Sequence, residues 1–439
     1  MKRLVLIAIL IAAPVVIAAS VAGTGGAETF TSAAGSSGAA VEWRPLAGPA
    51  DVPPAPAADD SASVRGLTVH EWGTFTSVAG PDGTAIDWLP AGGPTDLPCF
   101  VSVSGAGPKG LAIAEQGGRA KMAKVRMETP VLYFYAPEEQ TVNVKVSFPH
   151  GLMTEWYPSG ATLLPSVWDA HKTFPDVSST IQWSGVKVMP GATATYPLDE
   201  SPSHYYAARH TSSAPLQVGA QFEKFLFYRG VASFTPPVSV RVAADGRIAV
   251  SNLGSEPITG IVLFENRGGK IGYGISRNVN QTITLNRPEL NASFARLRED
   301  LEGLLRSQGM YAQEARAMVD TWKDTWFEQG TRIFYIVPSH SVDSILPLEI
   351  TPRPIAVARA FVGRMEVLTP ATQEEVRQAI AKNDRSTLEA YGRFLDPIVN
   401  SFLGQRLSVE DRWRAADLIT SIRSDYVASA MACSKKRSW

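Results

Sequence analysis

The chain has 439 residues, with 41 Lys and Arg against 42 Asp and Glu, so its formal net charge is −1. Hydrophobic residues make up 45% of it, an ordinary fraction for a folded protein that is long enough for two domains. Because there is no basic field to hold phosphates, we expect neither a nucleic-acid partner nor binding to an anionic membrane surface.

The N-terminus has the pattern of an export signal. Lys2 and Arg3 precede an uncharged apolar run, residues 4–22, which ends in the small residues Ser-Val-Ala. We predict a signal peptide over residues 1–22 that is cleaved on export to the periplasm, cell envelope or medium. A retained membrane anchor is the alternative, because the run is nearly long enough to span a bilayer. No later segment reads as transmembrane.

Residues 23–65 are rich in Ala, Gly, Ser and Pro and contain few large apolar side chains. Such a segment cannot bury enough apolar surface to offset the chain entropy that is lost on folding. We therefore predict a disordered tether between the signal peptide and the folded part of the chain.

Residues 66–369 have mainly β patterns and are predicted to form a β-rich body. Its first stretch, residues 70–88, contains a His, a Glu, two Trp and a Gly close together in the sequence. Residues 70–76 and 84–88 flank the turn sequence Gly-Pro-Asp-Gly at 80–83, so we predict a hairpin there.

Further strands follow along the body. Alternating apolar residues over 131–135 and 142–148 flank a short turn, which predicts a hairpin with one solvent-exposed face. A clearer hairpin is predicted over 238–250 around an Asp-Gly turn, and residues 258–264 are long enough for a buried strand. Short strands at this spacing indicate a β-sandwich.

Helical spacing interrupts the β pattern once within the body. Apolar residues recur at that spacing on both sides of Gly309, which predicts an inserted helical hairpin over about 290–329. Strand patterns return over 332–337, 346–350 and 357–368.

The last part, residues 370–434, is predicted to be a helical subdomain. We expect helices near 371–383, 386–403 and 408–430, each beginning at a recognisable N-terminal signal. The predicted fold class is therefore α+β, with a β-sandwich-rich body, an inserted helical hairpin and a C-terminal helical subdomain.

One stretch matches a nucleotide-binding motif formally. Residues 105–110 read Gly-Ala-Gly-Pro-Lys-Gly, a G-x-G-x-x-G after a strand-like segment. The mechanism needs a helix that opens at the third glycine and then a parallel strand, but Gly117-Gly118 end any helix almost at once. We interpret the stretch as a glycine-rich loop and expect no nucleotide cofactor.

His70 and Glu71 are the first candidate catalytic residues. Because residue 74 is Thr, the H-E-x-x-H zinc helix is excluded. In a regular strand the two side chains point to opposite faces, so they could share a pocket only through a bulge, and Gly73 is the position that suits one. The structural alternative, which we favour, is a hydrogen-bonded histidine and a salt-bridged or surface carboxylate.

Four further polar residues of the body have aromatic residues near them in the sequence: Glu128, Glu155, His204 and Arg229. Such residues are usually paired for structural reasons. If the four converged with His70, the site would contain a base, an acid and an anion-binding group.

No compact metal-binding pattern is present. His150 and His171 match no zinc spacing, so a metal site, which the sequence leaves open, would have to be assembled from distant strands. Cys99 and Cys433 form neither a disulfide framework nor a metal cluster, and a single bridge between them is also left open. No G-x-S-x-G or P-loop motif occurs, which removes the usual α/β-hydrolase and P-loop classes.

Aromatic residues of the body offer a different kind of site. Trp72, Trp156, Tyr157 and Tyr205 are the candidate ligand-binding residues, because an exposed ring could stack on a sugar. The tryptophans of the helical hairpin instead match the buried face of their helix.

Four motifs resemble an uncharacterised family of exported bacterial proteins. They are His-Glu-Trp-Gly-Thr-Phe-Thr at 70–76, Met-Glu-Thr-Pro-Val-Leu-Tyr-Phe-Tyr at 127–135, Thr-Trp at 321–322 with Trp-Phe-Glu at 326–328, and Phe-Val-Gly-Arg at 361–364. The resemblance spans most of the chain beyond the tether. It implies export, and it carries over no catalytic residue because the family has no established activity.

Two functions follow as hypotheses. The first is a non-catalytic envelope or extracellular protein that binds a saccharide or a protein through the aromatic face of its β body. The second is an extracytoplasmic hydrolase, metal-assisted or with paired carboxylates, whose site is built from His70, Glu71, Glu128, Glu155 and His204. The first is favoured, because no known catalytic spacing is present.

Overall fold

The computed structural model of the chain describes residues 65–89, 97–104, 122–165, 176–199, 203–403 and 408–437, all of which belong to one unit, residues 40–439. The predicted signal peptide and nearly all of the predicted tether lie outside the described residues. The same is true of the G-x-G-x-x-G stretch and of His171.

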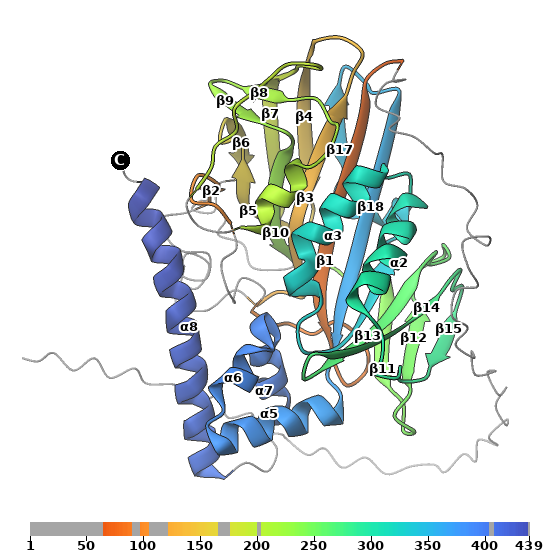
Figure 1. The fold of residues 1–439 in the computed structure, drawn as a ribbon, viewed down its shortest axis with the longest axis vertical. Helices are drawn as coiled ribbons and strands as arrows, with labels where there is room; N and C mark the ends of the chain where they lie inside the picture. The colour runs from red at the N-terminus through yellow and green to blue at the C-terminus, as the bar shows by residue number, and fades with distance from the viewer. Residues whose placement is uncertain are drawn as a thin grey trace, which may run out of the picture. The chain divides into compact units, whose positions relative to one another are not determined.

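A large mixed sheet is the main element of the described structure (Figure 1). Within the described residues it has nine strands, in the order β14-β13-β16-β18-β1-β3-β10-β5-β2. The first described strand lies beside the last, since β1 pairs in parallel with β18 and antiparallel with β3. The bounds are β1 Thr68–Ala79, β2 Ser102–Val103, β3 Val125–Tyr135, β5 Gly151–Tyr157, β10 Leu226–Ala232, β13 Ile261–Arg267, β14 Lys270–Ser276, β16 Gly330–Ile336 and β18 Ala356–Val367.

Two smaller sheets pack on one face of the large sheet, which we call the sandwich face. Their strands share a hydrophobic cluster with Phe75 of β1, Leu132 of β3 and Phe361 of β18. The first small sheet has the order β11-β12-β15, and the second has the order β17-β4-β7-β8-β9 with β6 added to β7. The bounds are β4 Gln140–Phe148, β6 Ala161–Leu164, β7 Ser179–Val188, β8 Leu216–Val218, β9 Gln221–Glu223, β11 Val238–Val242, β12 Ile248–Asn252, β15 Thr282–Leu285 and β17 Leu348–Thr351.

Two helices, α2 Phe294–Arg306 and α3 Ala312–Trp326, cover the other face of the large sheet, which we call the helical face. Leu301 of α2 and Trp322 of α3 share a second cluster with Trp72 of β1 and Val362 of β18. None of the helices in the described part of the chain is long and apolar enough to cross a membrane. The helices are η3 His204–Arg209, α2 Phe294–Arg306, α3 Ala312–Trp326, α4 Ser339–Ile345, α5 Pro370–Lys382, α6 Arg385–Glu389, η4 Gly392–Phe394, α7 Leu395–Leu403 and α8 Val409–Arg437.

Local sequence explains where several helices begin and end. The Ser293 hydroxyl accepts a hydrogen bond from the Arg296 N–H and starts α2. The Thr369 hydroxyl does the same for the Thr372 N–H at the start of α5. Asn383 ends α5 in the left-handed conformation, with φ of 55°, which Asn tolerates better than most residues.

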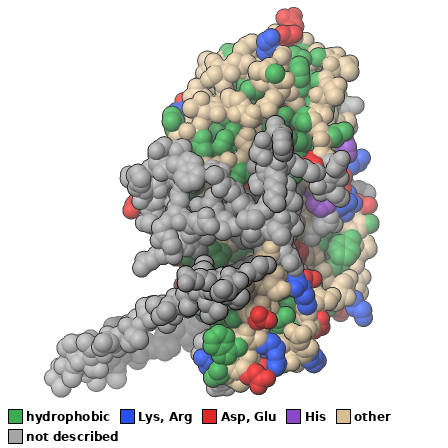
Figure 2. Space-filling model, turned by 90° about the vertical axis from the view of Figure 1, so that its left-hand side faces the viewer, with side chains coloured by type: hydrophobic (Ala, Val, Ile, Leu, Met, Phe, Trp, Pro, Cys, Tyr) green, Lys and Arg blue, Asp and Glu red, His purple; other side chains and the backbone are tan. Residues whose placement is uncertain are grey.

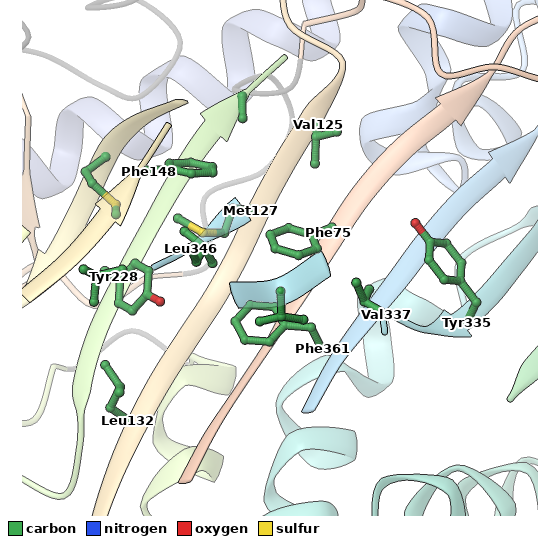
Figure 3. Close-up of a cluster of buried hydrophobic side chains, with 14 of the residues drawn as sticks. Phe75, Val125, Met127, Leu132, Phe148, Tyr228, Tyr335, Val337, Leu346 and Phe361 are labelled. Atoms are coloured by element: carbon green, nitrogen blue, oxygen red, sulfur yellow. The ribbon is translucent and has the colours of Figure 1, made fainter. Parts of the chain in front are cut away.

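The core of the sandwich depends on close contact between neighbouring strands. The rings of Phe75 and Phe361 stack with centroids 5.0 Å apart (Figure 3). Gly73 and Gly363 leave room for the rings beside them, since a Cβ would overlap Phe361 at the first position and Tyr335 at the second. Glycine at these two positions therefore lets aromatic rings lie directly on the backbone.

The fold class is α+β, as the sequence predicts, with several sheets and a C-terminal helical region. The helical hairpin is confirmed by α2 and α3, which lie within residues 290–329. The hairpin over 238–250 is confirmed by the pairing of β11 with β12 around Gly246, whose φ is 82°.

The predicted hairpin of residues 131–135 with 142–148 is wrong. Both strands form, but β3 pairs with β1 and β10, whereas β4 pairs with β17 and β7. The short turn between them carries the chain from one sheet to the other. The alternating pattern is satisfied because both strands bury side chains in the same core between the sheets.

The predicted hairpin of residues 70–76 with 84–88 is also wrong in its second arm. Residues 84–88 form two isolated bridges, from Ala85 to Ala79 and from Trp88 to Ala123. They add no strand beside β1, because β18 and β3 already occupy both of its edges.

The predicted helix over 386–403 is broken into α6, η4 and α7. Gly392 has φ of 50°, a left-handed conformation that interrupts a helix. The carboxylate of Glu328 occupies the space that a Cβ at Gly392 would need. The break places Arg393 and Phe394 against the large sheet.

Gly363→Ala is expected to destabilise the protein, because the added Cβ would overlap the Tyr335 ring on the neighbouring strand. Overpacking of this kind lowers the free energy of unfolding by about 1 to 3 kcal/mol, which urea denaturation measures. Gly303→Ala in α2 is the matched control. A Cβ there meets nothing within 4 Å, so the change should stabilise the helix by about 0.5 to 1 kcal/mol. Equal stabilities of the two variants would contradict the packing described.

Candidate functional site

His70 and Glu71 lie on opposite faces of β1. The Nδ1 atom of His70 is 2.8 Å from Oε2 of Glu314, in the first turn of α3 on the helical face. Glu314 also accepts hydrogen bonds from the Tyr135 hydroxyl at 2.7 Å and from the Tyr311 N–H at 2.8 Å. His70 is 4% exposed and Glu314 is 0% exposed. The imidazole is therefore a buried link between the sheet and the start of α3.

Glu71 is bound on the sandwich face. Its Oε2 atom lies 2.6 Å from Nε of Arg359 on β18, and its other oxygen accepts a hydrogen bond from the Tyr228 hydroxyl. Arg359 also donates to Asp343 at 2.8 Å. Burial and the nearby Glu71 charge raise the pKa of Tyr228 well above its usual value, so the hydroxyl remains a hydrogen-bond donor.

A bulge is present at Gly73, the position that the sequence offers for one. The register between β1 and β3 shifts between Trp72 and Thr74. The shift follows His70 and Glu71 along the strand, so it leaves their alternation unchanged. The structure therefore does not bring these two candidates into one pocket.

Three other candidates lie on adjacent strands of the helical face. Glu128 of β3 accepts a hydrogen bond from the Thr76 hydroxyl at 3.0 Å and lies 2.8 Å from Nε of Arg126. Glu155 of β5 is directly opposite Arg229 of β10. All three candidates are at most 3% exposed, so the structure brings them to one face and buries them there.

The same band of charge continues through residues that sequence analysis did not single out. Nε of Arg332 on β16 lies 2.8 Å from Glu366 on β18, and both side chains are 0% exposed. Arg364 of β18 lies 2.8 Å from Glu328, which follows α3. Arg393 of η4 pairs with the carboxylate of β3 described above. We call the following set the ion row: Arg126, Glu128, Glu155, Arg229, Glu328, Arg332, Arg364, Glu366 and Arg393.

Two signals in the sequence point to the ion row. Glu328 ends the Trp-Phe-Glu motif and Arg364 ends the Phe-Val-Gly-Arg motif. Arg364 and Glu366 also interrupt an otherwise apolar run over residues 360–367, and a charge in a buried strand requires a partner. Sequence reasoning could not assign the partners, because they come from other elements far along the chain.

Burial dominates the electrostatics of the ion row. It lowers the pKa of Arg364 to about 10, and it raises the pKa of Glu328 and Glu366 even though neighbouring guanidinium groups oppose that shift. The guanidinium groups of Arg364 and Arg332 lie 4.6 and 5.4 Å from the ring centroid of Phe394. Because carboxylates and guanidinium groups alternate, the row is suited to joining strands and helices to one another.

The candidates Tyr157 and Tyr205 lie together beside η3. The ring of Phe100 contacts both, with centroid distances of 4.9 and 5.7 Å. Both tyrosines are buried, and burial raises the pKa of Tyr157 to about 12. The hydroxyl of Tyr205 donates to Glu223 at 3.1 Å.

Arg209, the last residue of η3, is enclosed by aromatic rings. Its guanidinium lies 5.0 Å from the ring of Tyr206, 5.4 Å from Tyr196 and 5.9 Å from Phe100. Glu223 accepts two hydrogen bonds from it, from Nε at 2.9 Å and from Nη2 at 2.6 Å. The three rings are half-buried and so keep part of their surface in contact with solvent. We call Phe100, Tyr196, Tyr206 and Arg209 the aromatic rim.

The remaining candidates lie outside the aromatic rim. Trp72 is fully buried and offers no ring face to solvent. Trp156 is partly buried and packs against the core of the sandwich face. His204 is the first residue of η3 and is half-buried. Of the four predicted ligand-binding residues, the structure therefore brings only the two tyrosines together.

The described residues contain no metal-binding cluster, and their surface charge is mixed. Among the described residues, no group of three or more His, Cys, Asp or Glu is arranged to hold a metal ion. Cys99 is disulfide-bonded, and the side chain of Cys433 lies outside the described residues. On the described part of the face in Figure 2, charged side chains of both signs are interspersed with hydrophobic ones, in keeping with a net charge near zero.

Comparison with known proteins assigns no family. No family model and no curated protein matches the chain. Among solved structures, the yeast delta-COP-I mu-homology domain aligns over 69% of this chain and 98% of that domain, with 8% sequence identity and a TM-score of 0.25. So low a TM-score supports no conclusion about fold or function, and the site is interpreted from its own geometry.

Glu366→Gln should change how stability depends on pH. Burial raises the pKa of Glu366 in the folded protein above the value near 4.5 of the unfolded chain, so folding favours the protonated form. The wild type should therefore be most stable relative to the variant below that value. It should lose this advantage as the pH rises through the raised pKa.

Urea unfolding of both proteins from about pH 4 to about pH 8 measures the difference. Glu349→Gln is the control, because the Glu349 side chain is 63% exposed beside Lys145. A wild-type advantage over Glu366→Gln that grows with pH would show that the carboxylate is favoured in its charged form.

Proposed function

We propose that this chain is an exported, non-catalytic protein that binds a saccharide at the aromatic rim. The observation that carries the proposal is a difference in solvent exposure between the two groups of candidate residues. The charged candidates are buried within the sheet faces, whereas Phe100, Tyr196 and Tyr206 keep part of their rings exposed around Arg209. A protein ligand at the same surface is the second candidate, since aromatic and arginine side chains also dominate protein interfaces.

The chemistry of the aromatic rim suits a sugar. The apolar C–H face of a pyranose packs on a flat aromatic ring, while tyrosine hydroxyls and a guanidinium can hydrogen-bond to its hydroxyl groups. The Asp199 N–H donates to the Tyr206 hydroxyl at 2.8 Å, and the Cys99 N–H donates to the Asp199 carboxylate at 2.7 Å. With Arg209 also held by two bonds to Glu223, the rim is preorganised, which lowers the entropy lost on binding.

The hydrolase alternative has less support. A general acid or base must lie within hydrogen-bond or one-water reach of the substrate. Glu71, Glu128 and Glu155 are at most 1% exposed, and Glu71 and Glu128 each form an ion pair with arginine. His70 is bound to Glu314 on the other face of the strand from Glu71.

Ring deletion in the aromatic rim should weaken saccharide binding. A glycan array selects the best ligand of the full chain, and isothermal titration calorimetry then compares variants. Tyr206→Ala and Phe100→Ala should each lower affinity about fivefold, since a stacked ring contributes about 1 kcal/mol. Trp413→Ala is the control, because Trp413 is 74% exposed on α8. No bound glycan, or the same loss in the control, would contradict the proposal.

The export part of the proposal rests on the N-terminal pattern and the family resemblance. Expressed in a bacterium, the chain should be recovered outside the cytoplasm with its N-terminus at or near Gly23. Leu10→Arg, which interrupts the apolar run, should leave the uncleaved chain in the cytoplasm. Mass spectrometry of both fractions measures this. An intact N-terminus in the membrane fraction would favour the retained anchor instead.

A further inference from the structure

We propose a second ligand site, a cavity of about 530 Å³ that binds a short apolar peptide through its free amino and carboxyl ends. The cavity forms where residues 79–89, strand β11 and helices α5 and α7 meet. Its volume lies within the range of about 300 to 1,000 Å³ that is usual for small-molecule sites. None of its lining residues belongs to the aromatic rim or to the ion row.

Two opposite charges line this cavity without a partner. Asp87 comes from the segment after β1, and Arg241 comes from β11. Neither side chain has a hydrogen bond or ion pair with any described residue, and the two do not pair with each other. Asp396, the third charged residue of the lining, does have an interaction within the protein. A carboxylate and a guanidinium are thus free to bind a ligand that carries both a cation and an anion.

Of the uncharged polar side chains in the lining, some are hydrogen-bonded to other described residues and one is not. The Gln373 amide donates to the Ser401 hydroxyl at 2.9 Å, and that hydroxyl donates to the Ile398 carbonyl at 2.6 Å. These two side chains serve the contact between α5 and α7. Asn400 of α7 has no such bond to a described residue, and its amide can both donate to and accept from a peptide group.

The rest of the lining is largely apolar and is held in place. Ile86, Leu368 and Pro397 are among its side chains. Trp88 also lines the cavity, where its ring stacks on Phe394 with centroids 6.0 Å apart and its Nε1 donates to a backbone carbonyl at 3.1 Å. A preformed apolar wall of this kind suits aliphatic side chains.

The charges distinguish a peptide from a sugar. The hydroxyl groups of a neutral saccharide would leave Asp87 and Arg241 without opposite charges. A short peptide with free termini offers an ammonium group to the first and a carboxylate to the second, with its apolar side chains between them. Electrostatic complementarity then fixes the direction of the bound peptide.

Calorimetry on the full chain with leucyl-leucine tests the proposal. Blocking either end of the dipeptide, by N-acetylation or by C-terminal amidation, should weaken binding up to about fivefold, as expected for one partly exposed ion pair. Asp87→Asn should remove the effect of acetylation alone, and Arg241→Gln should remove the effect of amidation alone. This crossed pattern assigns each end of the ligand to one residue.

Matched controls come from exposed charges outside the cavity. Asp417→Asn in α8 and Arg277→Gln after β14 replace residues that also lack a described partner, and both variants should bind leucyl-leucine like the wild type. The proposal is overturned if leucyl-leucine does not bind, if the doubly blocked dipeptide binds as well, or if maltose binds and is lost in Asp87→Asn. Glycan binding at the aromatic rim should be unchanged in Asp87→Asn, which keeps the two sites separable.

Discussion

The ion row is the interaction on which the described structure depends. It places arginines and glutamates of six elements in the interior, where an unpaired charge is very costly. Shifting one strand by a single residue would separate Arg332 from Glu366 and leave both buried without a partner. The row therefore fixes the register of the central strands more firmly than apolar packing alone, because apolar side chains accept many neighbours and a buried guanidinium accepts few. Arg229 extends this restraint to α3, since its guanidinium lies 5.8 Å from the Trp322 ring.

The row also determines where ligands can reach the protein. Gly392 separates α6 from α7, so that Arg393 reaches Glu128 and Phe394 lies under the guanidinium of Arg364. The ring of Phe394 also stacks on the ring of Trp88, and Trp88 lines the cavity. A wall of the cavity is thus connected to the most restrained part of the interior. Both proposed ligand sites include side chains that are incompletely covered.

The sequence predicted what depends on neighbours along the chain. Strand alternation assigned His70 and Glu71 to opposite faces, and helical spacing located α2 and α3. The sequence could not predict which strands pair with each other or which charged side chains form ion pairs. Residues 131–135 and 142–148 read as strands, but nothing in either segment says that β3 and β4 belong to different sheets. The ion pairs have the same difficulty, since Glu71 and Arg359 are 288 positions apart, and only the parallel pairing of β1 with β18 brings them together.

Access and charge are distributed in a way that favours binding over catalysis. Three groups with shifted pKa values, Glu328, Glu366 and Arg364, are buried in the ion row, where a substrate would have to displace an ion pair to reach them. Two accessible charges, Asp87 and Arg241, line one cavity without forming an ion pair with each other. A general acid or base needs both a tuned pKa and contact with the substrate. The carboxylates of the ion row with shifted pKa values are buried, whereas binding needs only complementary groups held in fixed positions.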